Sequence, residues 1–238
     1  MKKTSLEIKN IKKACSVSDL AFDFILKKVN LGISEKQLAK QLSKFLRDNS
    51  DGIAFRSIVA FGENSEEIHH RPTDRKLQAG DTIMLDFGAK VNGYCSDISR
   101  TVFFEKISIK QKKVYEAVLK AQKKAIEYLE LRIRNHKSCK AYKVDKVSRD
   151  YLRRRGFDFP HSLGHGLGKK VHQGPRLSPK SRSYLKPGMV FTVEPGIYLK
   201  EFGVRIEDDI LIKNDGIEIL TKADKKLIEV KNSQLNFL

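Results

Sequence analysis

The sequence predicts an α+β fold in which helices cover one face of a largely antiparallel sheet. Segments with helical spacing of apolar residues are followed by segments with strand patterns, and this order occurs twice along the chain. The 238 residues are 40% hydrophobic, with only 15 glycines and 6 prolines, which allows one sizeable core and excludes a collagen-like or disordered chain. We expect one domain over residues 1–238, built as an approximate duplication of a helix-plus-hairpin unit.

The first half predicts two helices, a strand and a hairpin. Apolar residues with helical spacing run from about residue 6 to 29 and stop before Gly32. A second helix begins at a capping box, in which Ser34 and Gln37 satisfy each other's unpaired backbone N–H groups. Beyond it, β-branched and aromatic residues predict a strand over 53–61 and two strands over 82–104 that turn at Asn92-Gly93.

The second half repeats this order. Ser108 and Gln111 form another capping box that begins a long basic helix, and a further helix ends at Gly156. Strand patterns return at residues 190–193, 204–206 and 210–212. Together the two halves predict helices packed on the hairpins.

Two carboxylates stand in the first hairpin where a strand pattern buries side chains. If Lys90 pairs with Gly93, Asp86 lies directly opposite Asp97, and if Asn92-Gly93 is itself the turn, the two become diagonal neighbours on one face. Both registers bring the carboxylates close together. Because buried like charges repel unless a cation lies between them, the pattern implies a cation.

The later hairpin repeats this pattern with Glu194 and Glu207, and His165 lies in a glycine-rich segment between the two hairpins. Four carboxylates and one imidazole form a hard donor set that suits Mn²⁺, Co²⁺, Fe²⁺ or Zn²⁺. Bridging carboxylates can hold two divalent ions about 3.5–4 Å apart, a separation suited to hydrolysis. We therefore expect two metal ions, with Mn²⁺ as the first choice.

Five segments resemble the motifs of the creatinase/aminopeptidase, or pita-bread, metallopeptidases, and most closely those of Xaa-Pro aminopeptidases and prolidases. They are Leu-Asp-Phe-Gly (85–88), Gly-Tyr-Cys-Ser-Asp-Ile-Ser-Arg-Thr (93–101), Gly-His-Gly-Leu-Gly (164–168), Val-Glu-Pro-Gly-Ile-Tyr (193–198) and Gly-Val-Arg-Ile-Glu-Asp (203–208). The resemblance covers about residues 5 to 225. It implies a curved sheet covered by helices, with a pseudo-twofold repeat.

The resemblance also implies metal ligands. Asp86 would bind one ion, Asp97 and Glu207 would bridge the pair, and His165 and Glu194 would bind the other. A hydroxide activated by the two metals would then hydrolyse the N-terminal peptide bond of peptides, preferably Xaa-Pro.

Three residues match catalytic positions of the family. Glu194 would also carry the proton to the leaving amine, and His172 matches the histidine that contacts the tetrahedral intermediate. His69 matches the substrate-side histidine by its distance of twelve residues from Asp81, and His70 remains the alternative.

Two departures bear on specificity. The related Xaa-Pro enzymes usually carry a large N-terminal domain, and we expect none here, as in methionine aminopeptidases of the same fold. Gln173 follows His172 where the family usually has glutamate. Two other functions therefore stay open, methionine aminopeptidase and a non-catalytic module on this fold that binds peptides, RNA or the ribosome.

The chain has a formal net charge of +18, and residues 106–155 hold 17 Lys and Arg against 5 Asp and Glu. The expected partners are peptide substrates. A weak contact of these basic helices with nucleic acid or the ribosome also stays open, as does a homodimer. Three widely spaced cysteines and the lack of an apolar span favour a cytoplasmic protein without membrane contact.

Overall fold

The computed structural model describes residues 2–232, and within them the chain forms four α-helices and one 3₁₀-helix. The helices are α1 Ser5–Leu26, α2 Glu35–Asn49, η1 Gly62–Glu66, α3 Ile109–Arg134 and α4 Ala141–Arg153. The strands are β1 Gly52–Ile53, β2 Ile58–Phe61, β3 Thr82–Phe87, β4 Ala89–Val91, β5 Tyr94–Cys95, β6 Ile98–Phe104, β7 Cys139–Lys140, β8 Gly164–Gly166, β9 Gln173–Leu177, β10 Tyr184–Leu185, β11 Val190–Val193, β12 Gly196–Leu199, β13 Phe202–Arg205, β14 Asp208–Ile212, β15 Ile217–Ile219 and β16 Glu229–Val230.

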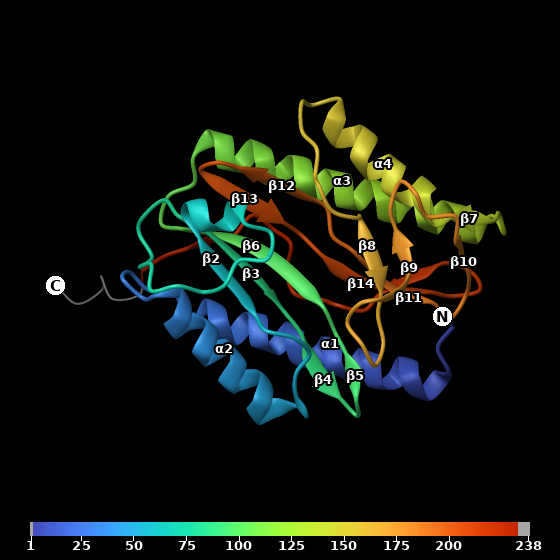
Figure 1. Ribbon diagram of the computed structural model, residues 1–238, viewed down its shortest axis with the longest axis horizontal. Helices are drawn as coiled ribbons and strands as arrows, with labels where there is room; N and C mark the ends of the chain where they lie inside the picture. The colour runs from blue at the N-terminus through green and yellow to red at the C-terminus, as the bar shows by residue number, and fades with distance from the viewer. Residues whose placement is uncertain (1, 233–238) are drawn as a thin grey trace.

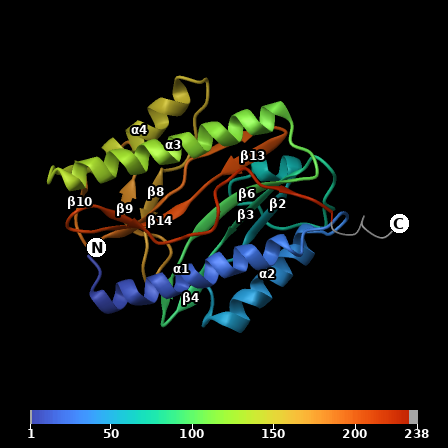
Figure 2. The ribbon, with the colours of Figure 1, turned by 180° about the vertical axis from the view of Figure 1, so that it is seen from behind.

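The strands lie between two pairs of helices, with α1 and α2 along one side and α3 and α4 along the other (Figure 1). The view from behind shows α1 and α3 each running along the strands of its own half (Figure 2). The main sheets have the orders β16-β6-β3-β2 and β15-β14-β11-β8-β9, and among their ladders only β16 with β6 is parallel. The predicted α+β fold with a largely antiparallel sheet is confirmed.

The helices begin where the caps predict. Ser34 and Ser108 each accept a hydrogen bond from the backbone N–H three residues on, and both capping boxes are complete. A third box at Thr4 and Glu7 begins α1, although the sequence analysis did not identify it. Local hydrogen bonding therefore sets these helix starts, as the residues alone indicate.

The first hairpin is broken in two. The prediction of one strand over 53–61 is wrong, because this range holds two separate strands. β1 pairs with β4, and β2 pairs with β3. The break lies opposite Gly88, where a Cβ atom would stand 2.0 Å from the carbonyl oxygen of Ser96. Only glycine allows this close approach, and the hairpin bends here.

The second half has the same arrangement. β11 pairs with β14 and β12 with β13 in one continuous register, interrupted at residues 194–195 and 206–207. β8 and β9, which the sequence analysis missed, extend this sheet beyond β11. Each half thus contributes a pair of helices and a long hairpin that bends midway.

Two apolar clusters form most of the core. One packs α3 and α4 on strands of the second half, and the other packs α1 and α2 on β2, β3 and β6. The halves meet where β13 and β14 pack against β3 and β6. Within residues 2–232, no helix combines the length and apolar composition that crossing a bilayer requires.

Candidate active site

A cavity of about 800 Å³ opens where the two halves meet. All five predicted metal ligands line it, and five of the six histidines of the chain do so as well. The ligands are Asp86, Asp97, His165, Glu194 and Glu207, and the histidines are His69, His70, His161, His165 and His172. The structure therefore brings every predicted site residue to one place.

The hairpin register places the first two carboxylates as diagonal neighbours. Asn92 and Gly93 form the turn, both with positive φ, and Lys90 pairs with Cys95. Asp86 consequently pairs with Ser99, two residues from Asp97. This is the second of the two predicted registers.

Three of the ligands come within reach of a single ion. One donor atom from each of Asp97, His165 and Glu207 lies within 4.8 Å of the others, and all three residues are buried. His165 Nε2 is 3.6 Å from Asp97 Oδ2 and 3.2 Å from Glu194 Oε1. The bends between strands aim these side chains inward, because Asp97, Glu194 and Glu207 all stand at strand breaks.

Burial and mutual repulsion shift the pKa values of the carboxylates in this cavity. Burial, followed by the charge of Glu207, raises the pKa of Asp97 well above its ordinary value. Burial and the charge of Glu194 do the same to the pKa of Glu207. Burial lowers the pKa of His165, but its hydrogen bond and ion pair with Glu194 outweigh burial and raise it. Such a cluster of buried negative groups favours cations.

The donor set fits divalent metal ions. Asp86 Oδ1 is buried and has no hydrogen-bond partner among the described residues, although a buried carboxylate oxygen is costly without one. Carboxylates with one imidazole suit Mn²⁺, Co²⁺, Fe²⁺ or Zn²⁺, whereas none of the cavity-lining residues is a cysteine. Asp86 thus offers a ligand atom that no protein donor occupies.

Hydrogen bonds from neighbouring side chains orient the carboxylates. Ser99 Oγ donates to Glu207 Oε2 at 2.7 Å, and Thr192 Oγ1 donates to Glu194 Oε1 at 2.9 Å. Arg205 Nη2 donates to Asp86 Oδ2 at 2.5 Å. Such contacts fix the direction in which a carboxylate presents its remaining oxygen to a metal.

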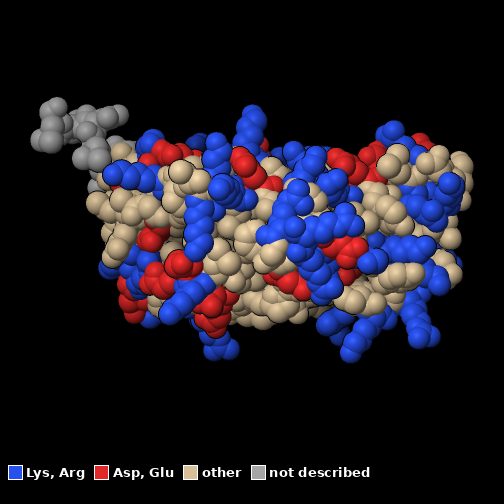
Figure 3. Space-filling model, turned by 90° about the horizontal axis from the view of Figure 1, so that it is seen from above, with Lys and Arg blue, Asp and Glu red and all other residues tan. Residues whose placement is uncertain are grey.

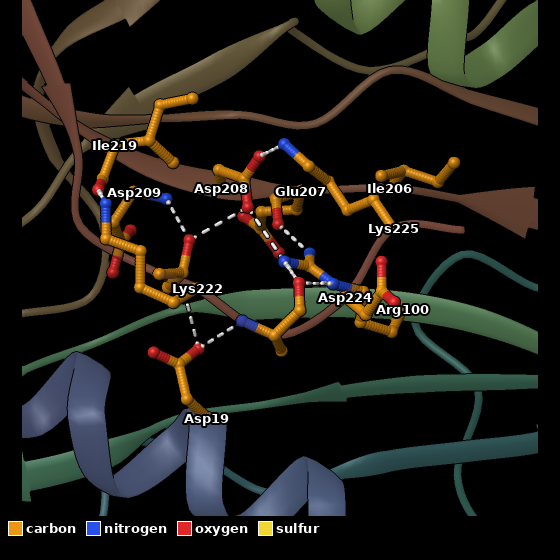
Figure 4. A network of polar contacts seen from close by, with 12 residues as sticks. Asp19, Arg100, Ile206, Glu207, Asp208, Asp209, Ile219, Lys222, Asp224 and Lys225 are labelled. Atoms are coloured by element: carbon orange, nitrogen blue, oxygen red, sulfur yellow. Dashed lines mark hydrogen bonds and ion pairs between the residues drawn. The ribbon is translucent and has the colours of Figure 1, made fainter.

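A buried network holds the backbone beside Glu207 (Figure 4). The Arg100 guanidinium donates to the Glu207 carbonyl and, at 2.8 Å, to Asp208 Oδ1. Lys225 also pairs with Asp208, and Asp19 on α1 accepts from the backbone N–H of Ala223 at 2.8 Å. Residues 223–225 are thereby tied to α1 and to Asp208, the residue after Glu207.

The paired histidines at 69 and 70 differ in environment. Both line the cavity, but His69 is exposed, whereas His70 is 6% exposed and lies 2.8 Å from Glu35 Oε2. The ring of His172 packs edge-on against His165 with 4.4 Å between centroids. The geometry thus leaves His69 and His172 accessible to a substrate.

Two further residues, which no motif of the sequence indicates, belong to the cavity wall and its support. His161 lines the cavity, and its Nε2 lies 2.8 Å from the hydroxyl of Tyr198. Arg205 Nη1 donates to the same hydroxyl at 2.9 Å, so Tyr198 does more than fill space. The one available signal was the position of His161, four residues before His165.

Known proteins resemble this chain closely. The Xaa-Pro dipeptidase of Pyrococcus furiosus is 37% identical over 230 residues, which cover 95% of this chain and 64% of that protein. A crystal structure of a dipeptidase from Pyrococcus horikoshii OT3 superposes with a TM-score of 0.92 at 41% identity, covering 96% of this chain and 64% of that one. The X-Pro aminopeptidase structure from Thermotoga maritima MSB8 superposes with a TM-score of 0.91 at 38% identity, covering 97% of this chain and 65% of that one.

The chain spans about 64% of the length of the curated relatives that it matches first. The family model described as metallopeptidase family M24 matches residues 9–214, a range that contains all five predicted ligands. With the fold and the donor set in agreement with that match, the chain belongs to metallopeptidase family M24.

Proposed function

We propose that this protein hydrolyses the N-terminal peptide bond of peptides in which proline follows, using two divalent metal ions. The observation that carries the proposal is that the five side chains predicted to bind metal line one cavity, where Asp86 Oδ1 has no hydrogen-bond donor among the described residues. The likeness to proteins described as Xaa-Pro dipeptidase and X-Pro aminopeptidase supports the substrate class.

The metal ions would be held by Asp86, Asp97, His165, Glu194 and Glu207. Bound divalent ions would supply a hydroxide nucleophile at neutral pH and polarise the scissile carbonyl. Mn²⁺ is the ion we propose first, because carboxylate-rich sites suit it. The hydrogen bonds described above, from Ser99, Thr192 and Arg205, would keep the proposed ligand carboxylates oriented toward the metal ions.

Three residues of this chain would act on the substrate. Glu194, beside His165, would pass a proton to the leaving amine. His172 would donate a hydrogen bond to the oxyanion, and His69, which also lines the cavity, would hold the peptide.

The mouth of the cavity would attract a carboxylate. Four exposed cationic side chains line it, and within residues 2–232 none of them forms an ion pair; they are Arg56, Arg71, Arg176 and Lys180. Once metal ions balance the buried carboxylates, these cations dominate the local field. We therefore infer that short peptides, whose terminal carboxylate reaches the mouth, are preferred over long ones.

The assay compares peptides with the Mn²⁺- or Co²⁺-loaded protein and with protein treated with chelator. Ala-Pro and Arg-Pro-Pro should be cleaved only with metal, and Ala-Pro should be cleaved faster than Ala-Pro amide. Cleavage of Met-Ala-Ser alone would replace the proposal with methionine aminopeptidase. If no metal supports hydrolysis and RNA is retained in a salt-dependent manner, the protein is a binding module instead.

Two secondary proposals concern a weak contact through the basic helices α3 and α4 and the location of the protein in the cell. The face formed by α3 and α4 displays many lysines and arginines with acidic side chains among them (Figure 3). Several of these cations are paired, for example Lys146 with Asp150 at 2.8 Å, which leaves at most a weak contact with an anionic polymer. Cys15, Cys95 and Cys139 are buried and form no disulfide in the described chain, which supports the cytoplasm as the location we propose.

A further inference from the structure

The segment that brings His69 to the cavity has little regular structure of its own. It connects β2 with β3, and apart from η1 and a single bridge between Ser34 and Lys76 it forms no helix or strand. Backbone hydrogen bonds join the Thr73 and Arg75 carbonyls to the N-terminal turn of α2, and side-chain contacts add to them.

The contacts converge on one carboxylate. Glu35, the first residue of α2, is fully buried. Its Oε1 accepts from the backbone N–H of Phe61 at 2.8 Å and from Asn64 Nδ2 at 2.9 Å. Its Oε2 accepts from the backbone N–H of Thr73 at 2.8 Å and from its hydroxyl at 2.6 Å, and lies 2.8 Å from His70 Nε2.

These partners are spread over residues 61–73, the first part of this connection. Phe61 is the last residue of β2, Thr73 lies 12 residues further on, and His70 stands between them, next to His69. The other ring nitrogen of His70 lies 2.9 Å from Glu67 Oε2, which fixes the ring from both sides. One buried carboxylate therefore closes residues 61–73 into a loop.

The charge of Glu35 suits this position. It stands at the N-terminal end of α2, where the helix dipole favours an anion. Burial raises the pKa of Glu35, but its hydrogen bonds with Thr73 and His70 outweigh burial and lower it. The side chain is thus an ionised acceptor for all of its neighbours.

We propose that Glu35 is a positioning residue for the reaction, and that by closing the loop 61–73 through Phe61, Thr73 and His70 it holds the imidazole of His69 at the cavity. This inference rests on the proposed function, in which His69 contacts the substrate. Glu35 itself touches neither the cavity nor a metal ligand in the described contacts.

The first test is a double-mutant cycle with Ala-Pro as substrate. In Glu35→Gln an amide NH₂ replaces one carboxylate oxygen and faces the N–H and O–H donors that this oxygen accepted from, so the loop should open. We expect kcat/KM to fall about 10–100-fold, as for a displacement of a catalytic group by about 1 Å. Combined with His69→Ala, it should lower kcat/KM no further than His69→Ala alone. If the two losses multiply, Glu35 does not act through His69 and the proposal is wrong.

Gln111→Ala provides the matched control. Gln111 is also buried, donates to the Gly80 carbonyl at 2.9 Å and is not among the residues that line the cavity. It should lower stability and leave kcat/KM unchanged, alone or with His69→Ala. Where Glu35→Gln does not fold, Thr73→Val removes one donor to the same carboxylate and should give a smaller loss with the same non-additivity.

The second test needs no activity. Hydrogen–deuterium exchange in Glu35→Gln should be faster within 61–73, with exchange at the strands beside the proposed metal ligands unchanged. Gln111→Ala, whose partner Gly80 lies outside this range, should leave exchange within 61–73 unchanged. Unaltered exchange across 61–73 would contradict the proposal even if the wild-type protein hydrolyses Ala-Pro. Absence of hydrolysis by the wild-type protein would reject the proposed function alone, and the exchange result would still judge the role of Glu35.

Discussion

Arg205 Nη2 donates to Asp86 Oδ2 at 2.5 Å, and both side chains are largely buried at the junction of the two halves. The same guanidinium donates to Ser99 Oγ at 2.9 Å and to the hydroxyl of Tyr198 at 2.9 Å. Because Ser99 in turn donates to Glu207, one arginine connects two proposed metal ligands from different hairpins. Among the described residues, Asp86 Oδ1 is left without a hydrogen-bond partner, which leaves it available to a metal ion.

Arg205→Lys should keep the charge and lose the geometry. An ammonium group cannot hold Asp86, Ser99 and Tyr198 in the planar arrangement of a guanidinium. We expect kcat/KM for Ala-Pro to fall about 100-fold, in the range found for a misplaced group at an active site. Steady-state kinetics with metal analysis checks this, and an unchanged kcat/KM would mean that Arg205 is only structural.

Tyr198→Phe removes the hydroxyl between His161 and Arg205. Burial raises the pKa of Tyr198 to about 12, so the hydroxyl stays protonated across the neutral range. The loss of activity should therefore be about the same at every pH from about 6 to 9, and about 10-fold for one hydrogen bond to a charged group. A loss that grows with pH in this range would contradict the assignment of a protonated hydroxyl.

His172→Ala should affect turnover and spare the metal. The ring packs on His165 but belongs to none of the five proposed ligands. Removing one donor to an oxyanion typically costs about 10²–10³-fold in kcat. Metal content per chain, measured after purification without chelator, should equal that of the wild type; a parallel loss of metal would instead make His172 a support for His165.

Metal-free protein should lose stability as pH rises. The folded-state pKa of Asp97 is raised by burial and by Glu207, so its contribution to the free energy of unfolding is complete below the unfolded pKa of about 3.9 and is lost as pH rises through the folded pKa. Asp97→Asn lacks this titration. The free energy of unfolding, measured in urea with chelator at pH 4, 6 and 8, should therefore rise in the variant relative to the wild type as pH increases. The change should reach at least about 1 kcal/mol, the free energy of roughly one pKa unit. A constant difference would show that the pKa is not raised.

Local signals allowed much of this to be predicted from the sequence. The capping boxes at Ser34 and Ser108 depend on residues three apart, and the Asn92-Gly93 turn decides the register that makes Asp86 and Asp97 neighbours. The four carboxylates proposed as ligands stand out because they recur inside strand patterns, and His165 stands out by its glycine-rich segment. These features need no knowledge of the rest of the fold.

Long-range contacts account for what was missed. β8 contains two glycines and pairs with β11 across 25 residues, so no alternating pattern identifies it. The strand over 53–61 breaks because Gly88 and Ser96, far along the chain, bend its partner. The roles of His161 and Tyr198 arise from a contact between residues 37 apart, which spacing cannot indicate.

In the proposed function, Asp97 and Glu207 would each bind both metal ions. Calorimetric titration of metal-free protein with Mn²⁺ should give two ions per chain for the wild type and fewer for Asp97→Asn and Glu207→Gln, since neither amide can bridge two cations by its charge. Hydrolysis of Ala-Pro should fall by several orders of magnitude in both variants with the fold retained. Two bound ions and near wild-type hydrolysis in both variants would contradict the assignment of the site.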